Sequence, residues 1–265
     1  MIFSTIEHDP TARAVERQIE MLILEGILCA GDKLPGERDL SKSLNVSRPI
    51  LRQAISSLKN KKLLIARHGG ATLIADVIGT VFAPPVADII RNNAKAKADY
   101  LEYRSEVESV AASMAADRAT VSDKAVLERI TEEMKRAHEA CDPDWEAEMD
   151  VQFHNAIGDC AHNIILLHTL RSCYRLLKDD VFYNRRILYD SNGMREKLLQ
   201  QHLDIYDAVV SGDQRKAARA ARKHIEFIQA VSNEFDVSET RSKVSDQRLE
   251  QRENRSHSKK KPSQR

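Results

Sequence analysis

Apolar residues in the first sixty positions recur at helical spacing in three short segments. The first segment, 11–29, keeps its apolar side chains on one helical face and has Gly26 near its end. The second segment spans 37–44 and the third spans 48–60, with Ser47 placed as the N-cap of the third. Short amphipathic helices joined by a tight turn are the pattern of a helix-turn-helix.

Two β-type runs follow the third helix. Residues 63–67 and 71–75 flank a His-Gly-Gly segment at 68–70, and this order predicts a hairpin, or wing. The region 1–76 is therefore expected to form a winged helix-turn-helix domain.

From residue 77 onward the pattern is helical alone. A linker or linker helix is expected over 77–96, and an all-α antiparallel helical bundle over 97–235. The tail, 236–265, has few apolar residues and is expected to be disordered. The fold class is thus mainly α. The predicted helices of the bundle span 98–119, 122–140, 143–160, 163–190, 194–211 and 213–234.

Charge separates these regions, although the net charge of the whole chain is only +1. Between Lys33 and His68 there are nine Lys or Arg and two acidic residues, whereas 77–235 carries 21 basic and 26 acidic residues. A compact basic module on an acidic body is typical of a DNA-binding domain joined to a domain with another task. A merely solvated basic face is the alternative.

The remaining composition predicts a cytoplasmic protein without a membrane partner. The chain contains no run of eighteen apolar residues and no recognisable signal peptide. Its four cysteines are scattered, with no Cys-x-x-Cys pair, as in reduced cytosolic proteins.

The start of the third helix carries the candidate base-reading side chains. Arg48 and Arg52 lie four residues apart and opposite the apolar stripe, and Arg is the side chain that most often reads guanine in the major groove. Arg38, on the preceding helix, could reach a phosphate or a base. The wing glycines would let the backbone approach the minor groove. The candidate DNA-binding residues are Arg38, Ser47, Arg48, Arg52, His68 and Gly69.

A second constellation lies in the bundle. Asp150 and His154 are four residues apart, so they leave one helix face together. His202 and His224 flank the turn at 212–213 and would differ in height by about 3 Å in an antiparallel hairpin. One carboxylate and three imidazoles suit Zn²⁺, Ni²⁺ or Mn²⁺ with open positions for a ligand. The spacing leaves open that each histidine is an ordinary surface or core residue.

Arg104, on the first predicted helix of the bundle, is the candidate for binding an anionic effector. A guanidinium pairs bidentately with a carboxylate, which a metal ion nearby could also bind. An Arg104–Glu108 pair within the helix is the alternative.

The stretch KLPGERDLSKSLNVSRPILRQAISSL, followed by LLIARHGGATLI, resembles the GntR superfamily. The helical region 97–235 resembles the ligand-binding FCD domain of its FadR branch. Within that branch the likeness is greatest to the pyruvate dehydrogenase complex repressors and the L-lactate-responsive regulators. One departure is Lys62, which stands where the family commonly has glycine before the wing.

The resemblance implies roles for individual residues. In that family, the positions that match Arg38, Arg48, Arg52, His68 and Gly69 contact operator DNA. Many FCD domains bind a divalent metal through the positions that match Asp150, His154, His202 and His224. An arginine that matches Arg104 binds small carboxylates in some of them.

These features together predict a transcriptional regulator and not an enzyme. A homodimer would place two recognition helices on a palindromic double-stranded operator, and a small carboxylate such as pyruvate or lactate would release it. Metal-dependent recognition of glycolate or citrate also stays open. Repression is the commoner mode in the family. The alternatives are a regulator that senses the metal itself and, in a different class, a metal-dependent enzyme of the helical domain.

Overall fold

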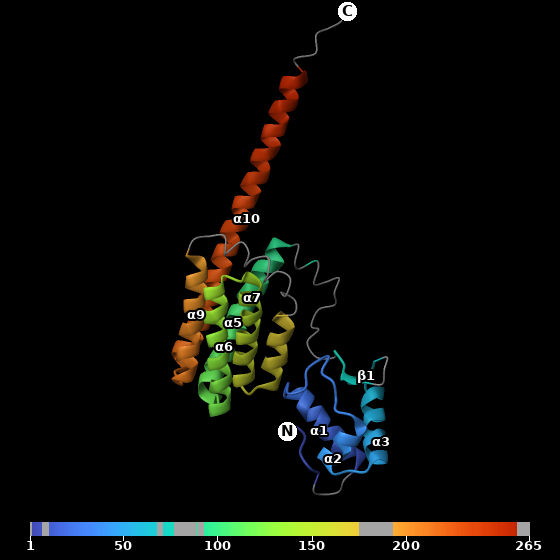
Figure 1. Cartoon of the computed structure of the whole chain (residues 1–265). Coiled ribbons are helices and arrows are strands. Elements are labelled where there is room, and N and C mark those ends of the chain that lie inside the picture. The colour runs from blue at the N-terminus through green and yellow to red at the C-terminus, as the bar shows by residue number, and fades with distance from the viewer. Residues whose placement is uncertain are drawn as a thin grey trace, which may run out of the picture.

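The computed structural model of the chain describes residues 2–6, 11–67, 71–76, 89, 93–174 and 193–258. Within these ranges, an N-terminal module of helices and one hairpin lies beside a larger, purely helical body (Figure 1). This arrangement confirms the predicted fold class. None of the described helices combines the length and the apolar character that crossing a membrane requires.

The N-terminal module is a winged helix-turn-helix. It consists of α1 (Ala12–Leu24), α2 (Glu37–Leu44), α3 (Arg48–Asn60), β1 (Leu64–Ala66) and β2 (Thr72–Ile74). The two strands pair antiparallel, with Leu64 opposite Ile74. The largest fully buried side chains of its core come from all five elements and are Ile19, Leu40, Leu44, Leu51, Leu58, Leu64 and Ile74.

Local sequence determines where these helices begin and end. Thr11 caps α1 by accepting a hydrogen bond from the backbone N–H of Ala14. Asn45 adopts the left-handed conformation, φ 53°, that turns the chain from α2 into α3. Pro49 lies in the first turn of α3, where its missing N–H leaves no helical hydrogen bond unmade.

The body packs its helices roughly antiparallel. They are α5 (Ala94–Arg118), α6 (Val121–Ala140), α7 (Pro143–Cys160), the helical residues 164–174, α9 (Met194–Val210) and α10 (Gln214–Ser258). Small side chains let α5 and α10 approach closely: Ala217 and Ala221 are buried, and the hydroxyl of Ser109 donates to the backbone carbonyl of Ala218 at 3.1 Å. This close packing brings the N-terminal part of α10 to the centre of the bundle.

One helix start differs from the sequence expectation, since α5 begins four residues before the predicted position 98, and two predicted boundaries fall outside the described residues. The predicted linker, 77–96, falls largely outside the described residues, and α5 begins at Ala94. The predicted helix over 163–190 is described, and helical, over 164–174.

The tail was expected to be disordered from residue 236, whereas α10 continues to Ser258 and projects beyond the bundle (Figure 1). No glycine or proline occurs between Gly212 and Pro262, so nothing in the local sequence ends the helix. A low apolar content removes packing partners, but a helix satisfies its backbone hydrogen bonds internally without them.

Lys62 adopts a left-handed backbone conformation, φ 60°, between α3 and β1. A side chain in this region costs roughly 1–2 kcal/mol, which glycine avoids. We expect Lys62→Gly to raise the free energy of unfolding by about 0.5–1 kcal/mol. The gain is smaller than the strain that is removed, because glycine has more conformational entropy in the unfolded chain. Chemical denaturation of the full chain measures this change. Lys59→Gly, inside α3, is the matched control and should lower stability by about 1 kcal/mol. A change of the same sign in both variants would contradict the assignment of strain to Lys62.

Candidate functional site

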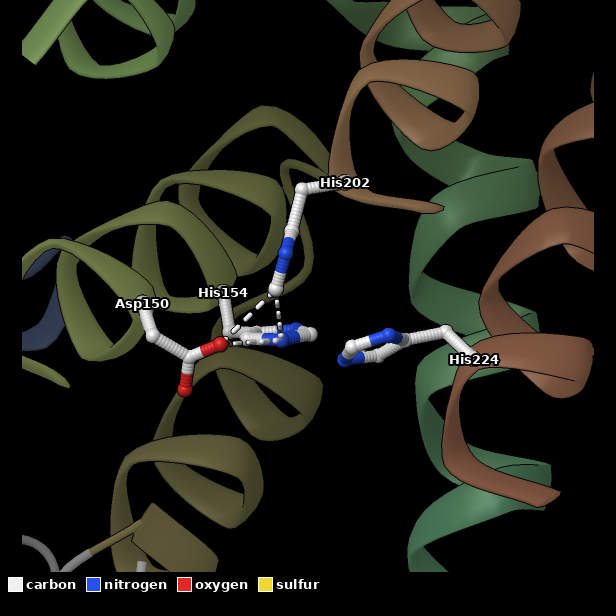
Figure 2. A group of neighbouring side chains, drawn as sticks. All are labelled: Asp150, His154, His202 and His224. Atoms are coloured by element: carbon white, nitrogen blue, oxygen red, sulfur yellow. Dashed lines mark hydrogen bonds and ion pairs between the residues drawn. The ribbon is translucent and has the colours of Figure 1, made fainter. Parts of the chain in front are cut away.

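Four side chains meet at the centre of the helical body. Asp150 and His154 come from α7, His202 from α9 and His224 from α10 (Figure 2). Their ligand atoms all lie within 4.8 Å of one another, and each residue is at most 3% exposed. The structure therefore brings together all four residues that the sequence grouped.

The shortest contacts in this cluster involve atoms that all carry lone pairs. Asp150 Oδ1 lies 2.7 Å from His202 Nε2 and 3.5 Å from His154 Nε2. The two Nε2 atoms are 3.3 Å apart. His224 approaches from the other side, with its ring centroid 4.4 Å from that of His202 (Figure 2).

The opposite ring nitrogen of each histidine faces an oxygen that can only accept a hydrogen bond. Nδ1 of His154 lies 2.7 Å from the carboxylate of Glu108, and Nδ1 of His202 lies 2.8 Å from the backbone carbonyl of Leu198. Nδ1 of His224 lies 3.0 Å from the amide oxygen of Gln201. Each Nδ1 must therefore carry the proton. In the neutral imidazole, Nε2 then presents a lone pair to the centre of the cluster.

This arrangement fits a divalent metal ion. Three imidazole nitrogens and one carboxylate are common ligands of Zn²⁺, Ni²⁺ and Mn²⁺, and outer acceptors on Nδ1 are typical of metal-binding histidines. Lone pairs that converge in a buried site repel one another unless a cation or a proton lies between them.

Glu108, on α5, connects this cluster to Arg104. Its carboxylate accepts hydrogen bonds from Arg104 Nε and, at 2.6 Å, from the hydroxyl of Tyr174, in addition to its contact with His154. Arg104 Nη2 also donates to the Tyr174 oxygen at 2.9 Å. The Arg104–Glu108 pair, which the sequence left as the alternative for Arg104, is therefore present. A direct contact between Arg104 and an effector stays a prediction.

Both members of this pair are fully buried and charged. Burial alone would raise the pKa of Glu108, but the charge of Arg104 and the contacts with His154 and Tyr174 lower it to about 2. Burial would likewise lower the pKa of Arg104, and the charge of Glu108 outweighs this effect and raises it. Sequence reasoning missed the roles of Glu108 toward His154, of Tyr174 and of Gln201. Only the i, i+4 spacing of Arg104 and Glu108 gave a signal.

The candidate DNA-binding residues form an exposed face of the N-terminal module. Arg38 on α2, Arg48 and Arg52 on α3, and Ser47 at the N-cap of α3 are all exposed. The hydroxyl of Ser47 makes no capping hydrogen bond. Arg52 donates to Glu37 at 2.7 Å, a pairing that the sequence did not suggest. The wing residues His68 and Gly69 lie outside the described residues.

A further basic residue of the module, Lys61, pairs with acidic residues of α1. Lys61 forms ion pairs with Glu16 at 2.9 Å and Glu20 at 2.8 Å, both on α1. Its charge is therefore partly neutralised on the α1 side of the module.

Comparison with known proteins assigns both parts of the chain. Residues 11–74 match the family of bacterial regulatory proteins called the gntR family, and residues 99–227 match the FCD domain. A protein of Escherichia coli (strain K12) that is named as a regulatory protein of the L-lactate dehydrogenase operon is 34% identical over 86% of this chain and 88% of its own length. The chain belongs to the GntR family.

Other GntR relatives support the same assignment. The Glc operon transcriptional activator of Escherichia coli (strain K12) is 30% identical over 87% of this chain and 92% of its own length. The structure of a GntR protein from Streptococcus agalactiae superposes with a TM-score of 0.54 at 25% identity, over 83% of this chain and 99% of that one. These relatives are transcriptional regulators and not enzymes.

In this GntR protein the two domains contact each other through the helix at 164–174. His168 Nε2 lies 2.8 Å from the backbone carbonyl of Leu24, and the guanidinium of Arg171 lies against Gly26. A groove of about 850 Å³ runs between the domains, and Tyr174 is among its lining residues. Tyr174 thus borders both this groove and the buried cluster.

Tyr174 offers a direct test of the Glu108 network. Tyr174→Phe removes one donor to Glu108 and one acceptor from Arg104 and leaves the aromatic packing in place. We expect the free energy of unfolding to fall by about 1–3 kcal/mol, because both partners stay buried and charged. Chemical denaturation provides the measurement. Tyr206→Phe is the control, since the hydroxyl of Tyr206 makes no hydrogen bond with the described residues, and it should change stability by less than about 0.5 kcal/mol. Equal effects of the two substitutions would show that the Tyr174 hydroxyl contributes nothing particular.

Proposed function

We propose that this GntR protein is a metal-dependent repressor of a metabolic operon that a small carboxylate, such as pyruvate or lactate, releases from DNA. The observation that carries the proposal is the convergence of three imidazoles and the Asp150 carboxylate in one buried cluster, with Nδ1 of each of His154, His202 and His224 facing an oxygen that accepts a hydrogen bond. Asp150, His154, His202 and His224 would hold Zn²⁺, Ni²⁺ or Mn²⁺. When bound, the ion supplies a Lewis-acidic centre with positions left for an oxygen ligand.

The protein side of this centre is already ordered. Glu108, Leu198 and Gln201 fix the orientation of the three histidine rings, so little reorganisation is needed to bind the ion. A carboxylate effector would occupy an open position of the metal. Arg104 is joined to His154 through Glu108, and it is the basic residue proposed, together with Glu108, to set the charge that an effector meets there.

The DNA-binding part of the proposal rests on the exposed face of α2 and α3. A homodimer in the cytoplasm would present two copies of this face to a palindromic operator, with Arg48 and Arg52 directed to base edges and Arg38 to a phosphate or a base. The wing residues His68 and Gly69 are proposed to reach the minor groove. To release DNA, the effector must bind the DNA-free arrangement more tightly than the bound one.

The choice of effector class follows from the relatives. A regulator named for an L-lactate dehydrogenase operon shares 34% of its residues with this chain over nearly its full length. Lactate is a 2-hydroxy acid, whose carboxylate and hydroxyl can together occupy two positions on one metal ion.

Calorimetric titration tests the metal and the effector in turn. After chelation, the protein should bind one Zn²⁺, Ni²⁺ or Mn²⁺ per chain. His202→Ala should lower that affinity at least about a hundredfold, because even outer partners of metal-binding histidines contribute 10- to 100-fold. The metal-loaded protein is then titrated with pyruvate, L-lactate, glycolate and citrate. His162→Ala, an exposed histidine outside the cluster, is the control and should change neither affinity. Operator release by the metal alone, without an acid, would instead make the ion the signal.

Operator binding tests the recognition face. Arg48→Ala should weaken binding to the operator by about 1–3 kcal/mol, because a base or phosphate contact made by a guanidinium is lost. Lys61→Ala removes the same charge from the same module but should change binding less than about threefold, since Lys61 is paired with Glu16 and Glu20. Fluorescence anisotropy at several salt concentrations measures both variants. Equal losses would mean that α3 contributes charge only and reads no bases.

A further inference from the structure

The guanidinium of Arg104 is a buried positive charge beside the cluster. It is 3% exposed, and it is the only Lys or Arg among the buried side chains of the described residues. Its carbon Cζ lies 4.6 Å from the centre of the Tyr174 ring, and that ring stacks on His154 at 5.3 Å. One aromatic ring therefore separates Arg104 from a residue of the proposed metal centre.

Glu108 neutralises this charge within the same helix. Its carboxylate bonds to Arg104 Nε on one side and to His154 Nδ1, at 2.7 Å, on the other. Glu108 is 4% exposed, so water does not screen the pair. Arg104 and Glu108 together add no net charge to the interior of the bundle.

This neutrality limits how much negative charge the site can accept. A divalent ion bound by one protein carboxylate, Asp150, keeps one unit of positive charge, which one effector carboxylate balances. A second carboxylate on the effector would need a second positive charge in the interior. Arg104 would supply it, but Glu108 has already neutralised Arg104. An uncompensated charge in a buried site is strongly disfavoured.

We propose that Glu108 is a specificity-determining residue that, by neutralising Arg104, restricts the site to singly charged 2-hydroxy or 2-oxo acids. The inference rests on the proposed metal and carboxylate function and adds the charge of the effector to it. It also gives Arg104 a role that acts through charge balance, in place of direct contact with the effector.

The test compares acids that share one head group. L-lactate carries one carboxylate, and L-malate has the same 2-hydroxy acid head with a second carboxylate. 2-Hydroxy-4-methylpentanoate replaces that second carboxylate by an uncharged group of similar shape and controls for size. All three are titrated by calorimetry into the metal-loaded full chain, and the metal content of each sample is measured beforehand.

Two variants isolate the charge. Glu108→Gln keeps the shape of the side chain and leaves Arg104 unneutralised. The double variant Arg104→Gln with Glu108→Gln removes both charges and restores a neutral pair. The wild type should bind L-lactate at least about tenfold more tightly than L-malate. In Glu108→Gln the affinity ratio of malate to lactate should rise at least about tenfold, and in the double variant it should return to within about threefold of the wild type.

The outcomes separate the inference from the function beneath it. Wild-type protein that binds malate as tightly as lactate overturns the charge restriction while leaving the carboxylate effector intact, and so does an unchanged ratio in Glu108→Gln at full metal occupancy. Loss of both acids in the double variant at full metal occupancy, where Glu108→Gln still binds lactate, means that Arg104 contacts the effector directly, which also overturns the inference. If neither malate nor 2-hydroxy-4-methylpentanoate binds to any variant, the selectivity of the site depends on effector size, which overturns the inference.

Failure of every acid to bind the wild type rejects the proposed function itself. If Glu108→Gln does not fold, Arg104→Gln is the second variant: it leaves the charge of Glu108 without its partner, so the affinity ratio of malate to lactate should fall below that of the wild type, and an unchanged ratio overturns the inference.

Discussion

The buried carboxylate of Glu108 is the interaction on which the rest of the functional site depends. It accepts hydrogen bonds from three parts of the body: Arg104 on its own helix, His154 on α7 and Tyr174 on the helix at 164–174. An ionised carboxylate without partners would cost several kcal/mol in the interior, so folding must deliver these donors together. The hydrogen bond from His154 Nδ1 to the Glu108 carboxylate also fixes the imidazole ring with Nε2 toward the centre of the cluster. The need of one buried carboxylate for hydrogen-bond donors thereby orients a residue of the cluster.

The sequence predicted the cluster because its geometry is mostly local. Asp150 and His154 share a helix face, and His202 and His224 flank a single turn, so the helical rise alone places them at similar heights. Glu108 was recognised only as a partner of Arg104, since that contact is also local. Its contact with His154 joins residues 46 positions apart. That contact depends on how α5 and α7 pack, and side-chain spacing within one helix carries no information about it.

Spacing within one helix also failed to predict other features of the structure. Arg52 was expected to be free for DNA, whereas it is paired with Glu37, which the turn between α2 and α3 brings alongside. The pair is exposed, so it contributes little to stability, and the guanidinium of Arg52 stays available to a phosphate or a base. In the tail, composition predicted disorder because few apolar residues are present. The helix to Ser258 needs no tertiary partner in order to satisfy its backbone hydrogen bonds, so composition was a poor guide there.

The helix at 164–174 joins the two domains physically. Near its middle, His168 and Arg171 contact the end of α1 and the turn after it, and Tyr174 reaches Glu108 beside the cluster. A helix transmits displacement as a nearly rigid unit over such a short length, because its backbone hydrogen bonds resist bending. A ligand that changes the position of Tyr174 must therefore change either the contacts with α1 or the packing of the helix itself. Coupling between the buried centre and the DNA-binding module thus requires no long chain of residues, and its strength is limited by how differently the ligand binds the two arrangements of this one helix.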